Sequence, residues 1–457
     1  MSYRHDIRQL LLHSNITRLI TFGRDSSMPE RNILLGYLVY MAIGFGMLML
    51  PWSRHQDASW LDNLFTAVSA VSTTGLATVD IPGTYTILGQ AVILLLIQIG
   101  GIGYMTMSSY IFFKITHHAD YTGRVIDASI SRPQGMELQD LVNNIIHFTF
   151  IFELIGFVSF FIALSHADAP LPGWNALFLS VSSFCTAGFS PFSDSLCSFS
   201  DNIAINLTVA VLSYAGAMGF IVITDILYKI KRRNYRLTFT TKVIVLVTAI
   251  MTIGGTVILT FSPTMDAASH GWPTRVLLSF FQTMSAMTTV GFNTVDLSTL
   301  RVGPILVFAL IMFIGASPSG TGGGVKSTSV SAVWGFVISK LGLRKDVTFL
   351  GRHIPHYRVD TALTSIIVYG VMIFLGCVTL SYSEPFPLSQ ILFESASAIG
   401  TVGLSTGITP ELSTVGKVTI IVLMYIGRVG VITFGTALIG RLKERNRQAQ
   451  RHEDLAA

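Results

Sequence analysis

Charged residues are scarce in this sequence of 457 residues. Asp, Glu, Lys and Arg together make up 12% of it, whereas 51% of the residues are hydrophobic. Soluble globular domains average about 25% charged residues. The composition therefore excludes an ordinary soluble domain and predicts a protein dissolved in a lipid bilayer, with no nucleic acid among its partners.

Residue patterns that carry enzyme chemistry are also missing. The three cysteines, Cys185, Cys197 and Cys377, form no disulfide framework. The eleven histidines show no metal-ligand spacing, and no Ser-His-Asp or paired-carboxylate arrangement is readable. We therefore expect no enzyme activity and no cofactor in this chain. Because the first 32 residues are polar and basic, we expect no cleavable signal peptide and a retained first span.

Long apolar runs are abundant instead. A membrane-spanning helix needs about 20 apolar residues, and all but the run from Val302 approach that length. The eight runs are Ile33–Leu50, Ile87–Phe113, Ile145–Leu164, Ile203–Leu227, Val243–Phe261, Val302–Gly315, Ala362–Leu380 and Val418–Ile439.

Basic residues are confined to a few segments between these runs. Of the 30 Lys and Arg, 24 lie in five segments, 1–32, 114–140, 229–242, 340–360 and 441–457. The positive-inside rule places these segments, and both termini, in the cytoplasm. They could contact anionic lipid head groups or dock a regulatory subunit. The remaining loops are acidic, which would concentrate cations at the outer face, unless they simply lack basic residues.

One pattern of four residues occurs four times. Counting back from Gly291, Thr289 lies two residues earlier, Ser285 six and Phe281 ten. The glycines are 113, 103 and 112 residues apart, so the chain is a fourfold internal repeat. We call these residues the turn phenylalanines (Phe65, Phe178, Phe281, Phe393), turn serines (Ser69, Ser182, Ser285, Ser397), turn threonines (Thr73, Thr186, Thr289, Thr401) and turn glycines (Gly75, Gly188, Gly291, Gly403).

Each repeat consists of a span, an amphipathic stretch of about 12 residues that ends at the turn, and a second span. The stretch is too short to cross a bilayer, so it predicts a re-entrant half-helix. Each repeat then crosses twice, and the four copies point the same way. This predicts an all-α membrane protein of eight transmembrane helices, pseudo-fourfold around a central pore. The repeats are 33–113, 141–228, 243–340 and 361–440, between cytoplasmic termini 1–32 and 441–457.

The turns have the chemistry of a cation filter. Non-helical backbone is tolerated in a membrane only inside protein or along a polar path, and glycine allows its neighbours' carbonyls to point inward. A ring of carbonyls replaces the hydration shell of a cation, as in potassium channels. We therefore predict potassium binding at the backbone carbonyls of Ser72, Thr73, Thr74, Gly75, Cys185, Thr186, Ala187, Gly188, Thr288, Thr289, Val290, Gly291, Gly400, Thr401, Val402 and Gly403.

Two other interpretations of these motifs remain. Four glycine-assisted packing kinks would produce the same motif without a filter. The turn serines and turn phenylalanines are more simply explained by packing and capping of the half-helices than as ligands.

A second glycine pattern follows each turn. Gly-x-x-Gly occurs at Gly100–Gly103, Gly216–Gly219 and Gly427–Gly430, but the third repeat continues differently from Gly315. Proline costs about 3 and glycine about 1 kcal/mol relative to alanine in a helix, so we predict a broken third span with an intramembrane gating loop. This glycine-rich loop comprises Gly315, Ala316, Ser317, Pro318, Ser319, Gly320, Thr321, Gly322, Gly323, Gly324 and Val325.

Arg428 lies inside an apolar run. A central arginine costs about 2.5–3.5 kcal/mol by insertion scales, so such residues usually face the protein interior. We expect Arg428 to point into the pore beside the glycine-rich loop and to control passage. The alternative is a structural salt bridge with Glu153.

The repeated span–half-helix–span unit with Thr-x-Gly resembles the Trk/Ktr/HKT superfamily of potassium transporters over nearly the whole chain. Within it, the sequence is most similar to the KtrB-type membrane subunits of Ktr systems. The resemblance implies sodium-stimulated potassium uptake across a bacterial inner membrane, with glycine at all four turns favouring potassium over sodium. It also implies a homodimer with a cytoplasmic nucleotide-binding (KtrA-like) regulatory subunit, a gating loop in the third repeat and an arginine in the fourth.

Two rival functions remain open. A secondary transporter coupled to sodium or protons would need an additional coupling site, and current–voltage curves would reveal it. A membrane-embedded enzyme or scaffold would need no ordered filter, so replacing Gly291 with Ser would leave ion uptake unchanged.

Overall fold

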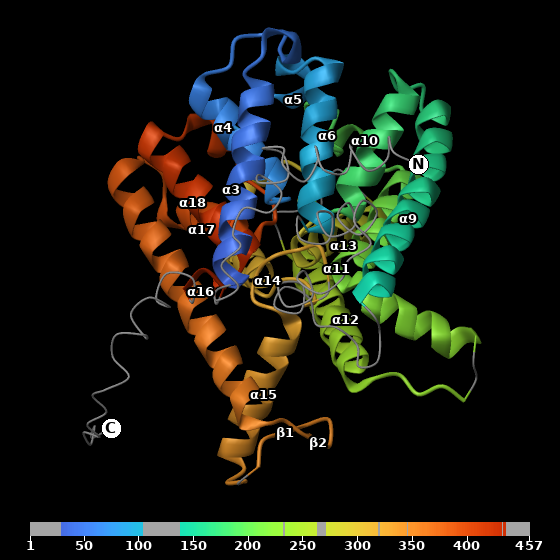
Figure 1. Cartoon of the computed structure of the whole chain (residues 1–457), viewed down its shortest axis with the longest axis vertical. Coiled ribbons are helices and arrows are strands. Elements are labelled where there is room, and N and C mark those ends of the chain that lie inside the picture. The colour runs from blue at the N-terminus through green and yellow to red at the C-terminus, as the bar shows by residue number, and fades with distance from the viewer. Residues whose placement is uncertain are drawn as a thin grey trace, which may run out of the picture.

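The computed structural model describes residues 29–103, 138–231, 234–262, 271–318, 320–344, 346–431 and 433–435. Helices dominate these residues (Figure 1). The strands among them are two pairs of residues, β1 (Thr348–Phe349) and β2 (Arg352–His353), which form a small antiparallel hairpin. The prediction of an all-α protein is therefore confirmed.

The helices follow one order in each repeat, which is a span, a half-helix and a second apolar helix. The first repeat contains α3 (Pro29–Leu48), η1 (Pro51–Ser53), α4 (Trp60–Val71), α5 (Ile81–Thr84) and α6 (Ile87–Ile102). The second contains α9 (Leu138–His166), α10 (Pro172–Phe184), η2 (Cys197–Phe199) and α11 (Ile203–Lys231). The third contains α12 (Phe239–Thr260), α13 (Trp272–Thr288), η3 (Leu297–Thr299), α14 (Val302–Phe313) and α15 (Ser327–Leu341). The fourth contains α16 (His356–Ser383), α17 (Leu388–Gly400), η4 (Thr409–Glu411) and α18 (Thr414–Val429).

Several helices begin at a capping side chain. Ser59, Thr86, Thr238 and Ser413 each accept a hydrogen bond from the backbone N–H three residues later, at the starts of α4, α6, α12 and α18. Such caps satisfy amide groups that have no partner within the helix. The half-helices α10 and α13 have proline in their first two residues instead, Pro172 and Pro273, and proline needs no amide partner there.

Within the described residues, three helices are long and apolar enough to cross a membrane, in α9, α12 and α16. α11 joins this group if its two parts, which meet at 105°, count as one bent span. The second helices α6 and α14 are apolar but shorter. The short α14 agrees with the short run that begins at Val302.

Every second span is interrupted, not only the third as the sequence analysis expected. α6 ends at Ile102 instead of continuing to Phe113, α11 bends at Gly219, and α18 ends at Val429. The cause is the last glycine of each Gly-x-x-Gly, whose φ angle is positive and incompatible with a helix: 87° at Gly103, 75° at Gly219 and 88° at Gly430. The remainders of the first and fourth predicted spans lie largely outside the described residues.

The first glycine of the same motif packs the second span against a half-helix. A side chain at Gly100 would overlap the carbonyl of Val71. The corresponding pairs in the second and fourth repeats are Gly216 with Phe184 and Gly427 with Ile399. Each carbonyl lies four residues before a turn glycine, so the motif fixes the span at the end of the half-helix.

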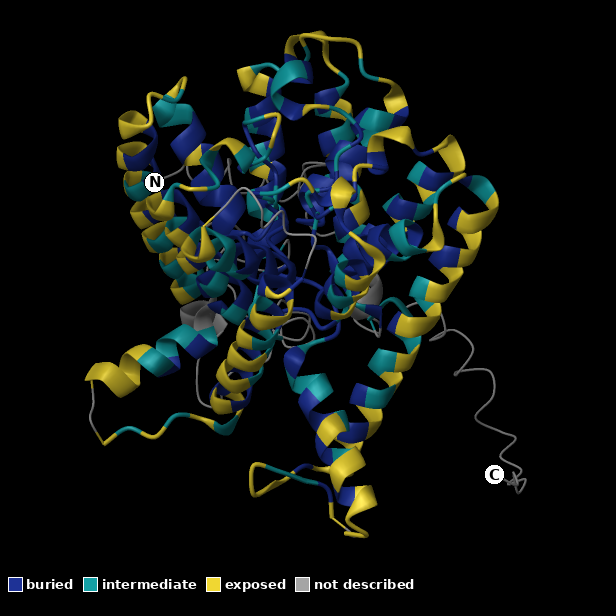
Figure 2. Ribbon diagram, turned by 180° about the vertical axis from the view of Figure 1, so that it is seen from behind, coloured by how far each residue is buried: buried dark blue, intermediate teal, exposed yellow. Residues whose placement is uncertain are grey.

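Large apolar side chains are exposed on the outside of this protein and the polar turns are buried at its centre, unlike in a soluble protein. The turns are buried at the centre, while exposed residues line the outer helices (Figure 2). Among the exposed residues of α9, Phe150 is 60% and Leu154 is 63% exposed. Polar backbone enclosed at the centre, behind apolar residues that face outward, is what a bilayer requires.

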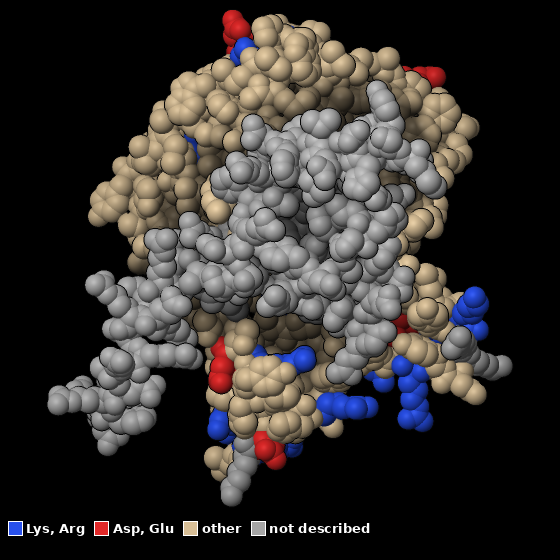
Figure 3. Space-filling view, in the orientation of Figure 1, with Lys and Arg blue, Asp and Glu red and all other residues tan. Residues whose placement is uncertain are grey.

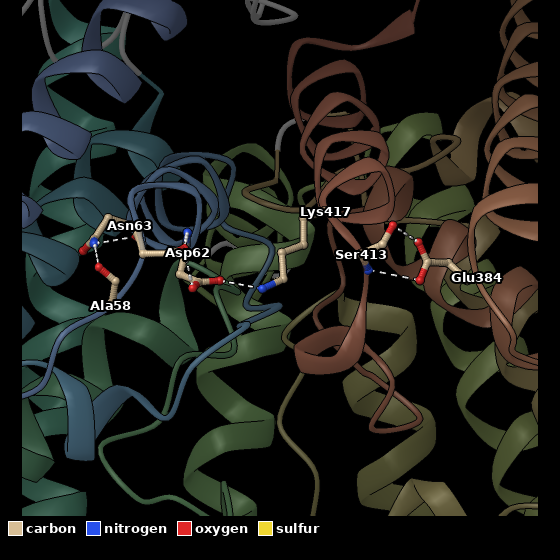
Figure 4. A network of polar contacts seen from close by, with 7 residues as sticks. Ala58, Asp62, Asn63, Glu384, Ser413 and Lys417 are labelled. Carbon is tan, nitrogen blue, oxygen red and sulfur yellow. Dashed lines mark hydrogen bonds and ion pairs between the residues drawn. The ribbon is translucent and has the colours of Figure 1, made fainter.

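Lys and Arg are most numerous at the end that carries β1 and β2, where some Asp and Glu also lie (Figure 3). We call this the basic end; it includes the exposed residues Lys340 in α15, Arg344 after α15 and Arg352 in β2. Close to the opposite end, the first and fourth repeats are joined by an ion pair of 2.7 Å between Asp62 in α4 and Lys417 in α18 (Figure 4).

Candidate functional site

The four turns have nearly the same backbone conformation. All four turn threonines are left-handed, with φ of 52°, 51°, 62° and 50° in chain order. The turn glycines follow with φ of 91°, 68°, 79° and 93°. Residues other than glycine adopt positive φ only at a few per cent of positions. The same unusual pair in four places is therefore set by the shared sequence and its surroundings.

The turns meet one another in a closed ring. A Cβ atom on Gly75 would lie 3.1 Å from the Cα of Gly188 and would overlap the carbonyl oxygen of Ala187. The other three turn glycines repeat this contact with the next turn in order, and Gly403 returns to Thr74 and Gly75. The carbonyls approached in this way are those of Ala187, Val290, Val402 and Thr74.

Two requirements therefore fall on the turn glycines. Their φ angles are positive, and the space where a side chain would stand is occupied by the carbonyl of the adjacent turn. Any other residue would strain its own backbone and push the neighbouring carbonyl away. The ring can keep this shape only with glycine at all four places.

The turn serines hold the turns in place, in two ways. Ser69 and Ser397 accept hydrogen bonds of 3.1 Å from the amides of Gly75 and Gly403. Ser182 and Ser285 instead donate to the carbonyls of Phe189 and Phe292, at 2.8 and 2.6 Å. All four turn serines are fully buried, as are the turn phenylalanines. Their positions agree with the interpretation that they pack and cap rather than bind an ion.

The first predicted residue of each turn belongs to the end of a half-helix. Ser72 and Cys185 are C-cap residues of α4 and α10 in helical conformation, and Thr288 and Gly400 are the last residues of α13 and α17. Four helix C-termini, with their partial negative charge, therefore lie at the turns. This electrostatic arrangement favours a cation beside the ring.

The glycine-rich loop is bonded to the second repeat. The amides of Ser317 and Thr321 donate to the carbonyls of Ala217 and Gly216, at 3.1 and 3.0 Å. The loop also closes on itself, because the amide of Ala316 donates to Gly323. Gly315, Gly320, Gly322, Gly323 and Gly324 all have another atom where a Cβ would stand. Pro318 is half-buried, and Ser319 lies outside the described residues.

Three of the turn threonines meet this loop. The Thr186 and Thr321 hydroxyls are 2.8 Å apart, and the amide of Gly323 donates to Thr401 Oγ1 at 3.0 Å. A Cβ on Gly322 would overlap Thr289 Oγ1. The loop therefore lies directly against the turns of the second, third and fourth repeats.

Arg428 reaches the remaining turn. Its guanidinium donates to Thr73 Oγ1 at 3.0 Å and also to the carbonyls of Thr321 and Gly100. Among the described residues, Arg428 forms no ion pair with Glu153, which was the alternative interpretation. That carboxylate instead lies 3.9 Å from Cys185 Sγ. Arg428 thus connects the first turn, the glycine-rich loop and the second span of the first repeat.

Lys326, the N-cap residue of α15, is a site residue that the sequence analysis did not single out. Its ammonium donates to the carbonyl of Gly322 at 2.7 Å, within the loop. Its position immediately after four glycines and Val325 was the available signal. A second missed group is the last glycine of each Gly-x-x-Gly, at which the second span breaks.

Comparison with known proteins agrees with this architecture. The family model described as "TrkH: Cation transport protein" matches residues 40–445. The chain is 34% identical to Ktr system potassium uptake protein B of Bacillus subtilis (strain 168) over 417 residues, 89% of this chain and 92% of that protein. It is 33% identical to the protein of the same name from Vibrio alginolyticus, over 89% of this chain and 90% of the relative.

A further relative and a solved structure extend the comparison. Potassium/sodium uptake protein NtpJ of Enterococcus hirae is 31% identical over 430 residues, 91% of this chain and 94% of that protein. The crystal structure of the potassium transporter TrkH from Vibrio parahaemolyticus has the same fold, with a TM-score of 0.70 at 18% identity, over 89% of this chain and 83% of that one. A chain with four glycine turns in a ring, matched over most of its length by this family model, belongs to the TrkH family of cation transport proteins.

Proposed function

We propose that this protein takes up potassium across the bacterial cell membrane through a channel-like pore along the axis of the four turns. The observation that carries the proposal is the closed ring in which each turn glycine abuts the carbonyl of the next turn. Carbonyl rings of this kind replace the water around a dehydrated cation. The names of the Ktr relatives, which are potassium uptake proteins, support potassium as the ion.

The membrane potential is a sufficient driving force for this uptake. It supplies about 2.3 kcal/mol per charge per 100 mV. Accumulation of a monovalent cation therefore needs no hydrolysis within the chain.

The glycine-rich loop and Arg428 are proposed to form the gate. They contact all four turn threonines between them, so an ion leaving the ring on this side meets the loop. The loop is held by several hydrogen bonds, each worth about 1 kcal/mol. Its release therefore requires a change in the surrounding helices that breaks these bonds together.

The regulatory partner is proposed to be a separate cytoplasmic nucleotide-binding subunit that docks at the basic end of a homodimer. The Ktr relatives are named as components of a system, which supports a partner chain. The exposed cations around β1 and β2 offer a surface for it. This assignment places the basic end, and both termini, in the cytoplasm.

Growth of a potassium-uptake-deficient bacterium tests the proposal. Expression of the chain should restore growth at low external potassium, and co-expression of a nucleotide-binding partner should increase uptake. A chain inserted in the membrane that leaves uptake at the background rate, with and without the partner, would refute it.

Coupling to sodium is a second form of the same function. One relative is named a potassium/sodium uptake protein. That name supports coupling to sodium, and it equally supports a channel-like pore that sodium stimulates. Current–voltage curves in a planar bilayer separate the two. A reversal potential that follows the potassium gradient alone supports permeation, whereas a shift with the sodium gradient supports symport.

A further inference from the structure

Glu394 is a fully buried carboxylate in α17, nine residues before the turn glycine of the fourth repeat. Four donors surround it, all from the segment that follows Gly403. Its Oε1 accepts from the Ser405 hydroxyl at 2.6 Å, the Thr406 amide at 2.9 Å and the Thr406 hydroxyl at 3.4 Å. Its Oε2 accepts from the Thr409 hydroxyl at 2.8 Å. We call Ser405–Thr409 the fourth outer segment.

The same two positions carry different chemistry in the other repeats. The residue nine before the turn glycine and the residue three after it form the pairs Thr66/Thr78, Leu179/Pro191, Gln282/Thr294 and Glu394/Thr406. In the third repeat the two side chains still bond, with Gln282 donating to Thr294 at 3.2 Å. Of the four pairs, only the one in the fourth repeat contains a charge.

A buried charge is tolerated only when donors replace its lost hydration. Hydrogen bonds to an ionised acceptor are about twice as strong as neutral ones. Four such bonds converge on a segment that begins two residues after Gly403, so they restrain the outer end of the fourth turn. Rigid positioning of carbonyls matters for a filter because the two alkali ions differ mainly in size and hydration.

We propose that Glu394 is a positioning residue for ion selectivity, and that its charge-assisted bonds fix the fourth outer segment and thereby the carbonyls of the adjacent turn. The inference rests on the proposed potassium uptake and deepens it by naming a residue outside the turns that sets the preference for potassium over sodium. Glu394 acts through this segment and does not itself touch the ion.

The decisive variant is Glu394→Gln, because glutamine keeps the size and can keep the hydrogen-bonded geometry. Its Oε1 can accept from the Thr406 amide and the Ser405 hydroxyl, and the Thr409 hydroxyl can rotate to accept from its Nε2. The variant thus removes the charge and weakens the bonds without emptying the site. We expect the potassium-to-sodium uptake ratio to fall about three- to tenfold and the KM for potassium to rise, with the maximal rate retained.

Glu384→Gln is the matched control. Glu384 is also buried and in the same repeat, but its carboxylate accepts from Ser413 at the start of α18 and does not hold a turn (Figure 4). Its substitution removes the same charge and should leave the ratio unchanged. If the two variants lower the ratio equally, a general loss of negative charge explains the effect and the proposal is wrong.

Thr409→Val provides a second test should Glu394→Gln fail to reach the membrane. It removes one donor to Glu394 while leaving the charge, and should lower the ratio about twofold. A potassium-to-sodium uptake ratio equal to that of the unmodified protein in Glu394→Gln would overturn the inference. If Glu394→Gln does not reach the membrane, the same result in Thr409→Val would overturn it. Because the unmodified chain is assayed alongside, loss of the proposed function would appear separately, as absent potassium uptake.

Discussion

The four turns are nearly identical, but the segments that follow them are not. In the first, second and fourth repeats, a glycine of the second span packs on the end of a half-helix. In the third repeat, Gly315 meets Gly323 and Gly324 of its own loop instead. The repeats thus keep one geometry where all four surround a common axis. They differ in the segments that follow the turns, where one repeat alone can supply a segment that crosses the axis.

Under the proposed function, this comparison separates two tasks of the pore, ion selection and control of passage. Selection requires carbonyls on all sides of the ion, so each repeat contributes the same turn. Control of passage requires one element that moves against a fixed frame, so one repeat is sufficient. Substitutions in the turns should therefore alter ion preference, and substitutions in the loop should alter rate.

The largest effect is expected for Gly291→Ser, which breaks the symmetry of the ring. The serine Cβ would overlap the carbonyl of Val402 at a φ of 79°. We expect the potassium-to-sodium uptake ratio to fall at least about tenfold. A ring with three unchanged turns and one displaced carbonyl no longer matches the ion. The measurement is uptake of both ions in cells or proteoliposomes.

Gly303→Ser is the control for this substitution. Gly303 is exposed in the first turn of α14 and has no atom within 4 Å of a built Cβ. Its variant should transport like the unmodified protein. Unchanged preference in Gly291→Ser would mean that the ring does not select.

Arg428→Gln should have the next largest effect, on rate. The guanidinium ties Thr73, Thr321 and Gly100 together, and a neutral amide cannot span all three. We expect the uptake rate to rise several-fold with ion preference little changed. Arg428→Lys keeps the charge but loses the planar fork, so a rate between the two indicates that geometry contributes. Unaltered uptake in Arg428→Gln would remove it from the gate.

Thr321→Val sharpens the comparison by detaching the loop from one turn. The variant loses the bond between the Thr321 and Thr186 hydroxyls and keeps the shape of the side chain. One hydrogen bond is worth about 0.5–1.5 kcal/mol, so we expect a two- to tenfold increase in rate at most. A change in the potassium-to-sodium ratio instead would show that the loop belongs to the filter.

The smallest effect concerns the seam between the first and last repeats. Asp62→Asn removes the ion pair with Lys417, in which both side chains are about 15% exposed. Ion pairs that keep access to solvent, as this one does, contribute on the order of 1 kcal/mol or less. Thermal unfolding in detergent should therefore begin a few degrees earlier, with ion preference unchanged. A double-mutant cycle with Lys417→Met isolates the contribution of the ion pair. A coupling free energy near zero would show that the pair does not stabilise the contact between the first and fourth repeats.

Much of the fold was predictable from periodicity and composition. The half-helices α4, α10, α13 and α17 end at their turns, as predicted, because each is followed by the same threonine and glycine. The first spans α3, α9, α12 and α16 overlap their apolar runs, and all four begin four to seven residues earlier than these runs. Local sequence was sufficient for these elements because the signals are close together in the chain.

The breaks at Gly103, Gly219 and Gly430 were not predicted, since a single glycine in an apolar run is compatible with a continuous transmembrane helix. The contacts of Lys326 were missed for a different reason. Its carbonyl partner belongs to a loop whose path depends on Gly216 and Ala217, about a hundred residues earlier in the chain. The bonds that place this loop on Gly216 and Ala217 leave no pattern in the residues next to Lys326.

The sequence by itself determined that four equivalent turns exist, that each is glycine-centred and that apolar helices flank them, because repetition and hydropathy are properties of the chain alone. Only the tertiary structure decided that each turn glycine abuts the carbonyl of the next turn, and that Arg428 and the glycine-rich loop reach all four turn threonines. Those contacts join residues up to 355 positions apart. They arise from how the helices pack around one axis, and no local pattern encodes that distance.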